Sequence, residues 1–124
     1  MRGKKVAVTA YTYVATLSSM LWMGCTPVFV DVDPQTLRMS PESLARAFAD
    51  HPDIAGVLPV HIYGLACDDQ ALSALCREHH AALIYDAAHA FGSTYQGRSL
   101  LDFGDYSIYT YKSTYLFITW INKR

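Results

Sequence analysis

The chain carries almost no net charge and has no long apolar run. Lysine and arginine total 10 and aspartate and glutamate total 11, which leaves a net charge of −1 in 124 residues. This balance gives no electrostatic basis for binding nucleic acid or an anionic membrane surface. No apolar run approaches the roughly 20 residues that cross a bilayer. The basic residues 1–5 precede a strand pattern, not the apolar core of a signal peptide. We expect a cytoplasmic protein.

Cysteine is also scarce. Cys25, Cys67 and Cys76 are odd in number and scattered, which predicts reduced thiols and not a disulfide framework. Cys76 is followed by His79 and His80, but no second pair of ligands stands at a spacing that metal sites use. We therefore predict no metal site and place both histidines at a helix end, near the negative pole of its dipole.

Short apolar runs alternate with helical patterns along the chain. Hydrophobic residues make up 52% of the sequence, as in a globular domain. We expect strands at residues 6–10, 27–32, 54–60, 81–85 and 106–110. Helices of 10–13 residues between the strands imply βαβ units. The predicted fold is α/β with three layers: a mostly parallel sheet covered by helices on both faces.

Each expected helix has a recognisable start. Thr12 can cap the first helix, which should end at Gly24. Ser40-Pro41-Glu42 begins the second helix with a capping hydroxyl, a proline and an acid. Asp68 or Asp69 caps the third helix. The first helix is expected to bury a stripe at helical spacing, made of Val14, Leu17, Met20 and Leu21.

The connections carry their own signals. Gln96-Gly97 predicts a tight hairpin turn. In parallel sheets, ligands bind beyond the carboxyl ends of the strands. Polar or aromatic residues follow three strands, at 11–13, 61–64 and 86–89, so we expect these segments to converge on one rim of the sheet.

Asp86 is the most informative residue at this rim. A carboxylate after four apolar residues is partly desolvated and needs a partner. The protonated ring nitrogen of a cofactor fits this need, and so do backbone amides of the next turn. His89 is either a cofactor contact or a structural hydrogen-bonder, and His61 is expected to order the junction before Gly64. Tyr13 can stack on an aromatic ligand or pack against protein.

Five segments occur in order at spacings typical of one family: 10–16, 24–33, 58–64, 86–92 and 103–105. They read AYTYVAT, GCTPVFVDVD, LPVHIYG, DAAHAFG and FGD. Together they resemble the DegT/DnrJ/StrS family of nucleotide-sugar aminotransferases, enzymes of the aspartate-aminotransferase fold (fold type I) that use pyridoxal 5′-phosphate (PLP). The resemblance covers residues 6–111, most of the chain.

The resemblance implies roles for individual residues. Asp86 would pair with the pyridine nitrogen of PLP, Tyr13 would stack on the ring, and His89 would lie near the phenolic oxygen. Thr110 would contact the phosphate. Family members transfer an amino group, usually from glutamate, to a keto-sugar carried on a nucleotide. They are typically homodimers, so a second copy of the chain is the implied protein partner.

The sequence departs from the family pattern near its end. The lysine that forms the Schiff base aligns with Tyr115, and Lys112 lies three residues earlier, roughly 10 Å along a strand and on its other face. Residues 1–124 are expected to be part of the large PLP-binding domain, without an N-terminal segment and a small C-terminal domain. Such a fragment would be inactive alone. A lysine-free sugar dehydratase-like relative, or a degenerate domain that binds without turnover, stay open as alternatives.

Overall fold

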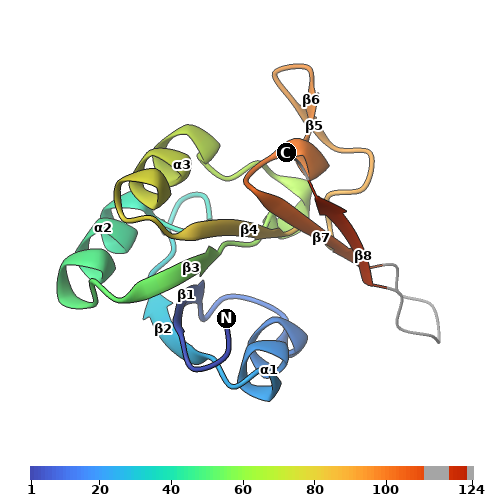
Figure 1. Ribbon diagram of the computed structural model, residues 1–124. Helices are drawn as coiled ribbons and strands as arrows, with labels where there is room; N and C mark the ends of the chain where they lie inside the picture. Colours follow the sequence, from blue (N-terminus) through green and yellow to red (C-terminus); the bar gives the residue numbers. More distant parts are fainter. Residues whose placement is uncertain (111–117, 123–124) are drawn as a thin grey trace.

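The computed structural model describes residues 1–110 and 118–122, with side chains described through Tyr109 (Figure 1). A six-stranded sheet with the order β2-β1-β3-β4-β7-β8 forms its centre. Its strands are β1 (Lys5–Thr9), β2 (Thr26–Val30), β3 (Ile54–Leu58), β4 (Ala82–Asp86), β7 (Tyr106–Thr110) and β8 (Ile118–Asn122). Five strands are parallel, and β8 pairs antiparallel with β7. The mostly parallel sheet is confirmed.

Helices cover both faces of this sheet (Figure 1). Helix α1 (Val14–Trp22) lies on one face, and α2 (Pro41–Asp50) and α3 (Asp69–Glu78) lie together on the other. The connections contain two short 3-10 helices, η1 (Ile62–Gly64) and η2 (Leu100–Asp102), and a hairpin of β5 (Thr94–Tyr95) and β6 (Arg98–Ser99). The three-layer α/β architecture is therefore as expected.

Alternation along β1 divides the core into two clusters. Ala7 points toward α2 and α3 and belongs to the larger cluster, while Val6 and Val8 point toward α1 and belong to the smaller one. Phe48 and Leu72 supply large buried side chains from α2 and α3. Because odd and even residues of the central strands serve different helices, both faces must be apolar, which explains the continuous apolar runs.

Several local predictions are confirmed. The Ser40 hydroxyl accepts a hydrogen bond from the Ser43 amide at 3.2 Å and caps α2. Asp68 caps α3 by accepting from the Ala71 amide at 3.0 Å. Residues 96 and 97 form the turn between β5 and β6 with φ of 51° and 77°, the left-handed conformation that tight hairpins need.

The first helix departs from the prediction in two ways. Tyr13, not Thr12, is the N-cap residue of α1, and it makes no side-chain capping bond. The buried positions are Thr16 and Met20, whereas Val14 and Leu21 are 68% and 52% exposed. The helix is rotated so that the i, i+4 pair Thr16 and Met20 faces the sheet.

Strand β8 was not predicted either, because the apolar segment that contains it had no turn signal before it.

The cysteines are buried, free thiols. Desolvation raises the pKa of Cys67 and of Cys76 to about 12, so both stay protonated at neutral pH. His79 is the C-cap residue of α3, as the sequence suggested. In the described part of the chain no group of metal-binding side chains gathers, and no helix there is long and apolar enough to cross a membrane.

Candidate functional site

Side-chain contacts tie three strand ends into one rim, at the carboxyl edge of β1, β3 and β4. The Tyr11 hydroxyl lies 2.7 Å from the Tyr63 hydroxyl, and the Tyr63 amide donates to Nδ1 of His89 at 3.3 Å. The Thr16 hydroxyl donates to a carboxylate oxygen of Asp86 at 2.7 Å. These contacts join the segments after β1, β3 and β4, as parallel strands require.

Asp86 ends β4 with a half-buried side chain. Its backbone extends the pairing with the segment after β3, because its amide donates to the Pro59 carbonyl at 2.9 Å and its carbonyl accepts from the His61 amide at 3.0 Å. Oδ1 accepts from the Ala88 amide at 3.1 Å, and Oδ2 accepts from Thr16. The turn-capping alternative is thus realised at one oxygen, while the other oxygen is held by α1.

Within residues 1–109, whose side chains the structure describes, no cationic side chain pairs with the Asp86 carboxylate. Among the described residues the one ion pair is Lys5–Asp53, at 2.9 Å. Both hydrogen-bond donors to Asp86 are neutral, and each carboxylate oxygen accepts one of its two possible bonds. A half-buried carboxylate of this kind suits a cationic N–H group from a ligand. The donors and acceptors present therefore fit a protonated pyridine ring.

His89 is exposed at the rim, with its ring parallel to that of Tyr63 and the centroids 6.3 Å apart. A backbone amide can only donate, so Nδ1 of His89 accepts and Nε2 is the ring nitrogen that carries a proton. Gly64 makes this close approach possible, because a Cβ there would lie 2.9 Å from the His89 carbonyl oxygen. The loop after β3 thus leaves His89 with a free hydrogen-bond donor.

The other predicted contacts are placed as follows. Tyr13 directly precedes α1 and is 68% exposed, so its ring is open to a ligand. Thr110 is the last residue of β7, two residues beyond the register partner of Asp86, Ile108, and its side chain lies outside the described part. Lys112 and Tyr115 both lie outside the described residues.

His61 is fully buried and serves the structure of the loop after β3. Its Nδ1 accepts from the Cys67 amide at 3.2 Å, and its ring stacks on Tyr85 at 4.2 Å. Burial lowers the pKa of His61 to about 4, so the ring is neutral at pH 7. This placement agrees with the expected role in ordering the junction before Gly64.

Sequence reasoning missed Thr16, and it placed Tyr11 and Tyr63 at the rim only as members of the segments 11–13 and 61–64, without their contact. One signal for Thr16 was available: it precedes the buried Met20 by one helical turn, so a hydroxyl at that position had to face the sheet and find a partner. The contact between the two tyrosine hydroxyls had no such signal, because Tyr63 has a positive φ, 54°, which the sequence does not reveal.

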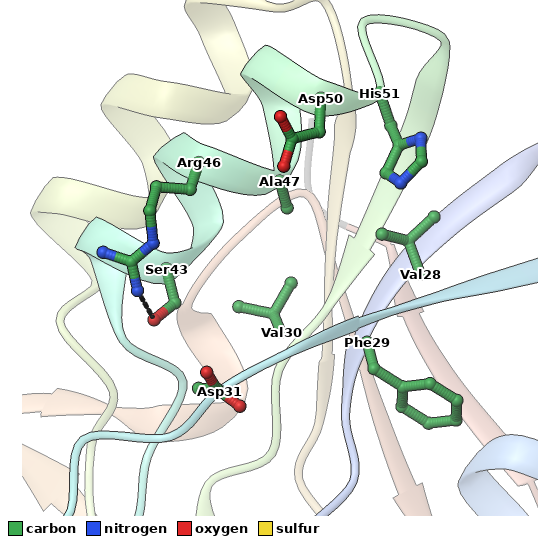
Figure 2. A pocket seen from close by; sticks show the side chains of 9 residues that line it. All are labelled: Val28, Phe29, Val30, Asp31, Ser43, Arg46, Ala47, Asp50 and His51. Carbon is green, nitrogen blue, oxygen red and sulfur yellow. Dashed lines mark hydrogen bonds between the residues drawn. The ribbon is translucent and has the colours of Figure 1, made fainter.

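Two hollows lie elsewhere on the surface. A hollow of about 190 Å³ lies between β2 and α2 (Figure 2), where Arg46 donates to the Ser43 hydroxyl at 2.8 Å. Its charged residues Asp31, Arg46 and Asp50 are all exposed, as on an ordinary surface. An open groove of about 860 Å³ runs between the starts of α2 and α3 and the β5–β6 hairpin. Neither includes Asp86 or His89, so both hollows lie apart from the rim.

The sequence pattern of the DegT/DnrJ/EryC1/StrS aminotransferase family matches residues 1–120. The chain belongs to this family. A dTDP-4-amino-4,6-dideoxy-D-glucose transaminase of Shigella dysenteriae is 40% identical over 115 residues, which are 93% of this chain and 31% of that protein. The chain therefore spans about a third of the relative's length. The family resemblance predicted from five motifs is confirmed.

Solved structures agree. An aminotransferase from Psychrobacter cryohalolentis superposes with a TM-score of 0.82 at 38% identity, over 88% of this chain and 27% of that one. A Bacillus subtilis protein, ntda, solved with bound cofactor PMP, superposes with a TM-score of 0.80 at 28% identity, over 90% of this chain and 24% of that one. The α/β fold of this chain is therefore the fold of the matching part of these two proteins.

Proposed function

We propose that this chain is part of the large domain of a PLP-dependent aminotransferase that acts on a keto-sugar linked to a nucleotide. Family membership and the dTDP-sugar transaminase relative support the reaction and the substrate class. The observation that carries the proposal is Asp86, a half-buried carboxylate at the rim with two neutral donors and no cationic side chain among the described residues. A protonated pyridine nitrogen supplies the cation that Asp86 lacks.

The residues of the rim divide the work of holding the cofactor. Asp86 accepts the ring N–H, the Tyr13 ring stacks on the pyridine face, and Nε2–H of His89 donates to the phenolic oxygen. Thr110 contacts the phosphate. Bound PLP supplies an electron sink for bonds at the substrate carbon, and Asp86 keeps the ring nitrogen protonated for that purpose. Glutamate as amino donor, a homodimer and a cytoplasmic location belong to the same proposal.

Whether Lys112 forms a Schiff base with PLP can be tested chemically. The chain incubated with PLP is reduced with borohydride and analysed by peptide mass spectrometry. We expect no pyridoxyl label on Lys112, because the family register places the reactive position at Tyr115. A label on Lys112 would show that this register is wrong and that the chain itself carries the reactive amine.

Cofactor binding by Asp86 is tested by titrating the chain with PLP and following absorbance and tyrosine fluorescence. Asp86→Asn removes the charge but keeps the shape, and the loss of a charge-assisted hydrogen bond should weaken binding about tenfold or more. Asp50→Asn, at an exposed position in α2, is the matched control and should bind like the parent chain. Equal affinity in Asp86→Asn and the parent chain would contradict the proposal.

A further inference from the structure

Among the described residues, Thr16 is the one side chain that donates a hydrogen bond to the Asp86 carboxylate. It lies in the first turn of α1, is 6% exposed, and reaches across 70 residues of sequence to donate its hydroxyl proton to Oδ2 of Asp86 at 2.7 Å. The Thr12 hydroxyl in turn donates to the Thr16 hydroxyl at 2.8 Å. Three side chains thus form a line of hydrogen bonds that ends on the carboxylate.

The direction of this line is fixed by chemistry. An ionised carboxylate only accepts, and a hydroxyl has one proton to give. The proton of Thr16 therefore points to Asp86, which leaves a lone pair of Thr16 to accept from Thr12. Hydrogen bonds that run in one direction polarise one another, so the Thr12 contact strengthens the bond that Thr16 makes to Asp86.

Neighbouring hydroxyls in the same helix behave differently. Ser18 donates to the Ala15 carbonyl at 3.4 Å and Ser19 to the Thr16 carbonyl at 3.0 Å, so both return to their own helix. Thr16 alone of these three leaves the helix for a partner on the sheet. Its branched Cβ also restricts χ1, which helps to hold the hydroxyl in one direction.

We propose that Thr16, supported by Thr12, is a positioning residue for Asp86. With Oδ2 held by Thr16 and Oδ1 held by the Ala88 amide, the plane of the carboxylate is fixed at two points. Held in this way, the carboxylate can accept a cationic N–H from a ligand at the rim. This inference rests on the proposed function in one respect, since the ligand that Asp86 meets is taken to be the pyridine nitrogen of PLP.

The test compares binding of PLP with binding of its 1-deaza analogue, which has carbon in place of the ring nitrogen. In the full chain, Thr16→Val removes the donor with little change of shape, and Thr16→Ser keeps it. We expect Thr16→Val to weaken PLP binding about tenfold, as for loss of a hydrogen bond to a charged group, and to leave the analogue's affinity unchanged. Thr16→Ser should bind PLP within about twofold of the parent chain. Ser18→Ala is the matched control and should bind both ligands normally.

A second measurement needs no cofactor. In the ligand-free chain, hydrogen exchange at the Ala88 amide reports how firmly Asp86 is held, and it should be faster in Thr16→Val than in Thr16→Ser or Ser18→Ala. If Ala88 exchange is unchanged, or if affinity for PLP and for its analogue falls equally, the positioning role of Thr16 is overturned. The proposed function is not affected by either result. A parent chain that binds both ligands equally overturns the proposed function, and the exchange comparison still decides whether Thr16 positions Asp86.

Discussion

The two faces of the sheet are built in different ways. Among the side chains that the structure describes, nineteen buried residues form the cluster under α2 and α3, and both helices begin with a side-chain cap. The face under α1 holds five, its helix has no side-chain cap, and several of its apolar side chains are exposed. Asp86 and Thr16 lie on this second face. Stability is therefore concentrated on one side and the candidate site on the other.

Deleting a large core side chain should show this difference most strongly. Phe48 of α2 is 1% exposed and stacks on His79 with centroids 4.1 Å apart. We expect Phe48→Ala to lower the free energy of unfolding by about 3 to 5 kcal/mol, measured by urea denaturation. Trp22 of α1 is 87% exposed, and Trp22→Ala should stay within about 0.5 kcal/mol of the parent chain. Equal losses in both variants would remove the distinction between the faces.

Acid should act on the α2–α3 face through His61. The folded-state pKa of about 4 lies below the ordinary 6.5, so between these values the unfolded chain binds a proton that the folded chain does not. Stability is then complete above pH 6.5 and falls as the pH drops toward 4, by about 2 to 3 kcal/mol at pH 4.5. Urea midpoints at pH 7.5 and 4.5 measure the loss.

Two variants sharpen this test. His61→Asn keeps an acceptor for the Cys67 amide and removes the titrating ring. The free energy of unfolding of this variant should therefore fall much less between pH 7.5 and 4.5 than that of the parent chain. His80→Gln changes an exposed histidine, and its free energy of unfolding should fall between pH 7.5 and 4.5 as much as that of the parent chain. A parent chain equally stable at both pH values would show that His61 is not held neutral.

Truncating a side chain of the smaller cluster, under α1, should lower the free energy of unfolding by an intermediate amount. Met20 of α1 is 6% exposed and packs with Val6, Val8 and Leu58. We expect Met20→Ala to lower the free energy of unfolding by about 2 kcal/mol, because few buried neighbours surround the space that it leaves. The same denaturation experiment compares it with Phe48→Ala. A larger loss in Met20→Ala would make α1 the more important helix for stability and reverse the comparison.

The contrast between the faces also explains what the sequence could predict. Helices α2 and α3 follow local rules, since Ser40, Pro41 and Asp68 act where their residue types place them. Helix α1 does not, because the Thr16 hydroxyl bonds to Asp86, 70 residues away, and the Thr12 hydroxyl bonds to Thr16 in place of a backbone amide at the helix start. Asp86 and His89 could be proposed from strand ends and motifs. The bond from Tyr63 to His89 depends on a left-handed residue that no local pattern indicated.

The missing cap of α1 leads to the smallest and most pointed prediction. Tyr13 occupies the N-cap position with φ −70° and ψ 143°, a conformation that a capping serine also adopts. Tyr13→Ser should therefore add a cap and raise the free energy of unfolding by about 0.5 to 1 kcal/mol. Asp68→Ala, which removes the cap of α3, is the matched opposite and should lower it by about 1 kcal/mol.

The same Tyr13→Ser variant loses the ring proposed to stack on PLP, so it should bind the cofactor more weakly while it unfolds less easily. Urea denaturation and PLP titration of one protein sample measure both effects. A gain in stability with unchanged PLP affinity would remove Tyr13 from the site. A loss of stability would mean that the tyrosine ring itself supports α1. The stability of Tyr13→Ser should rise and its PLP affinity should fall for the same reason. The residue at the N-cap position of α1 is a tyrosine that can contact a ligand at the rim, and it is not a residue that caps the helix.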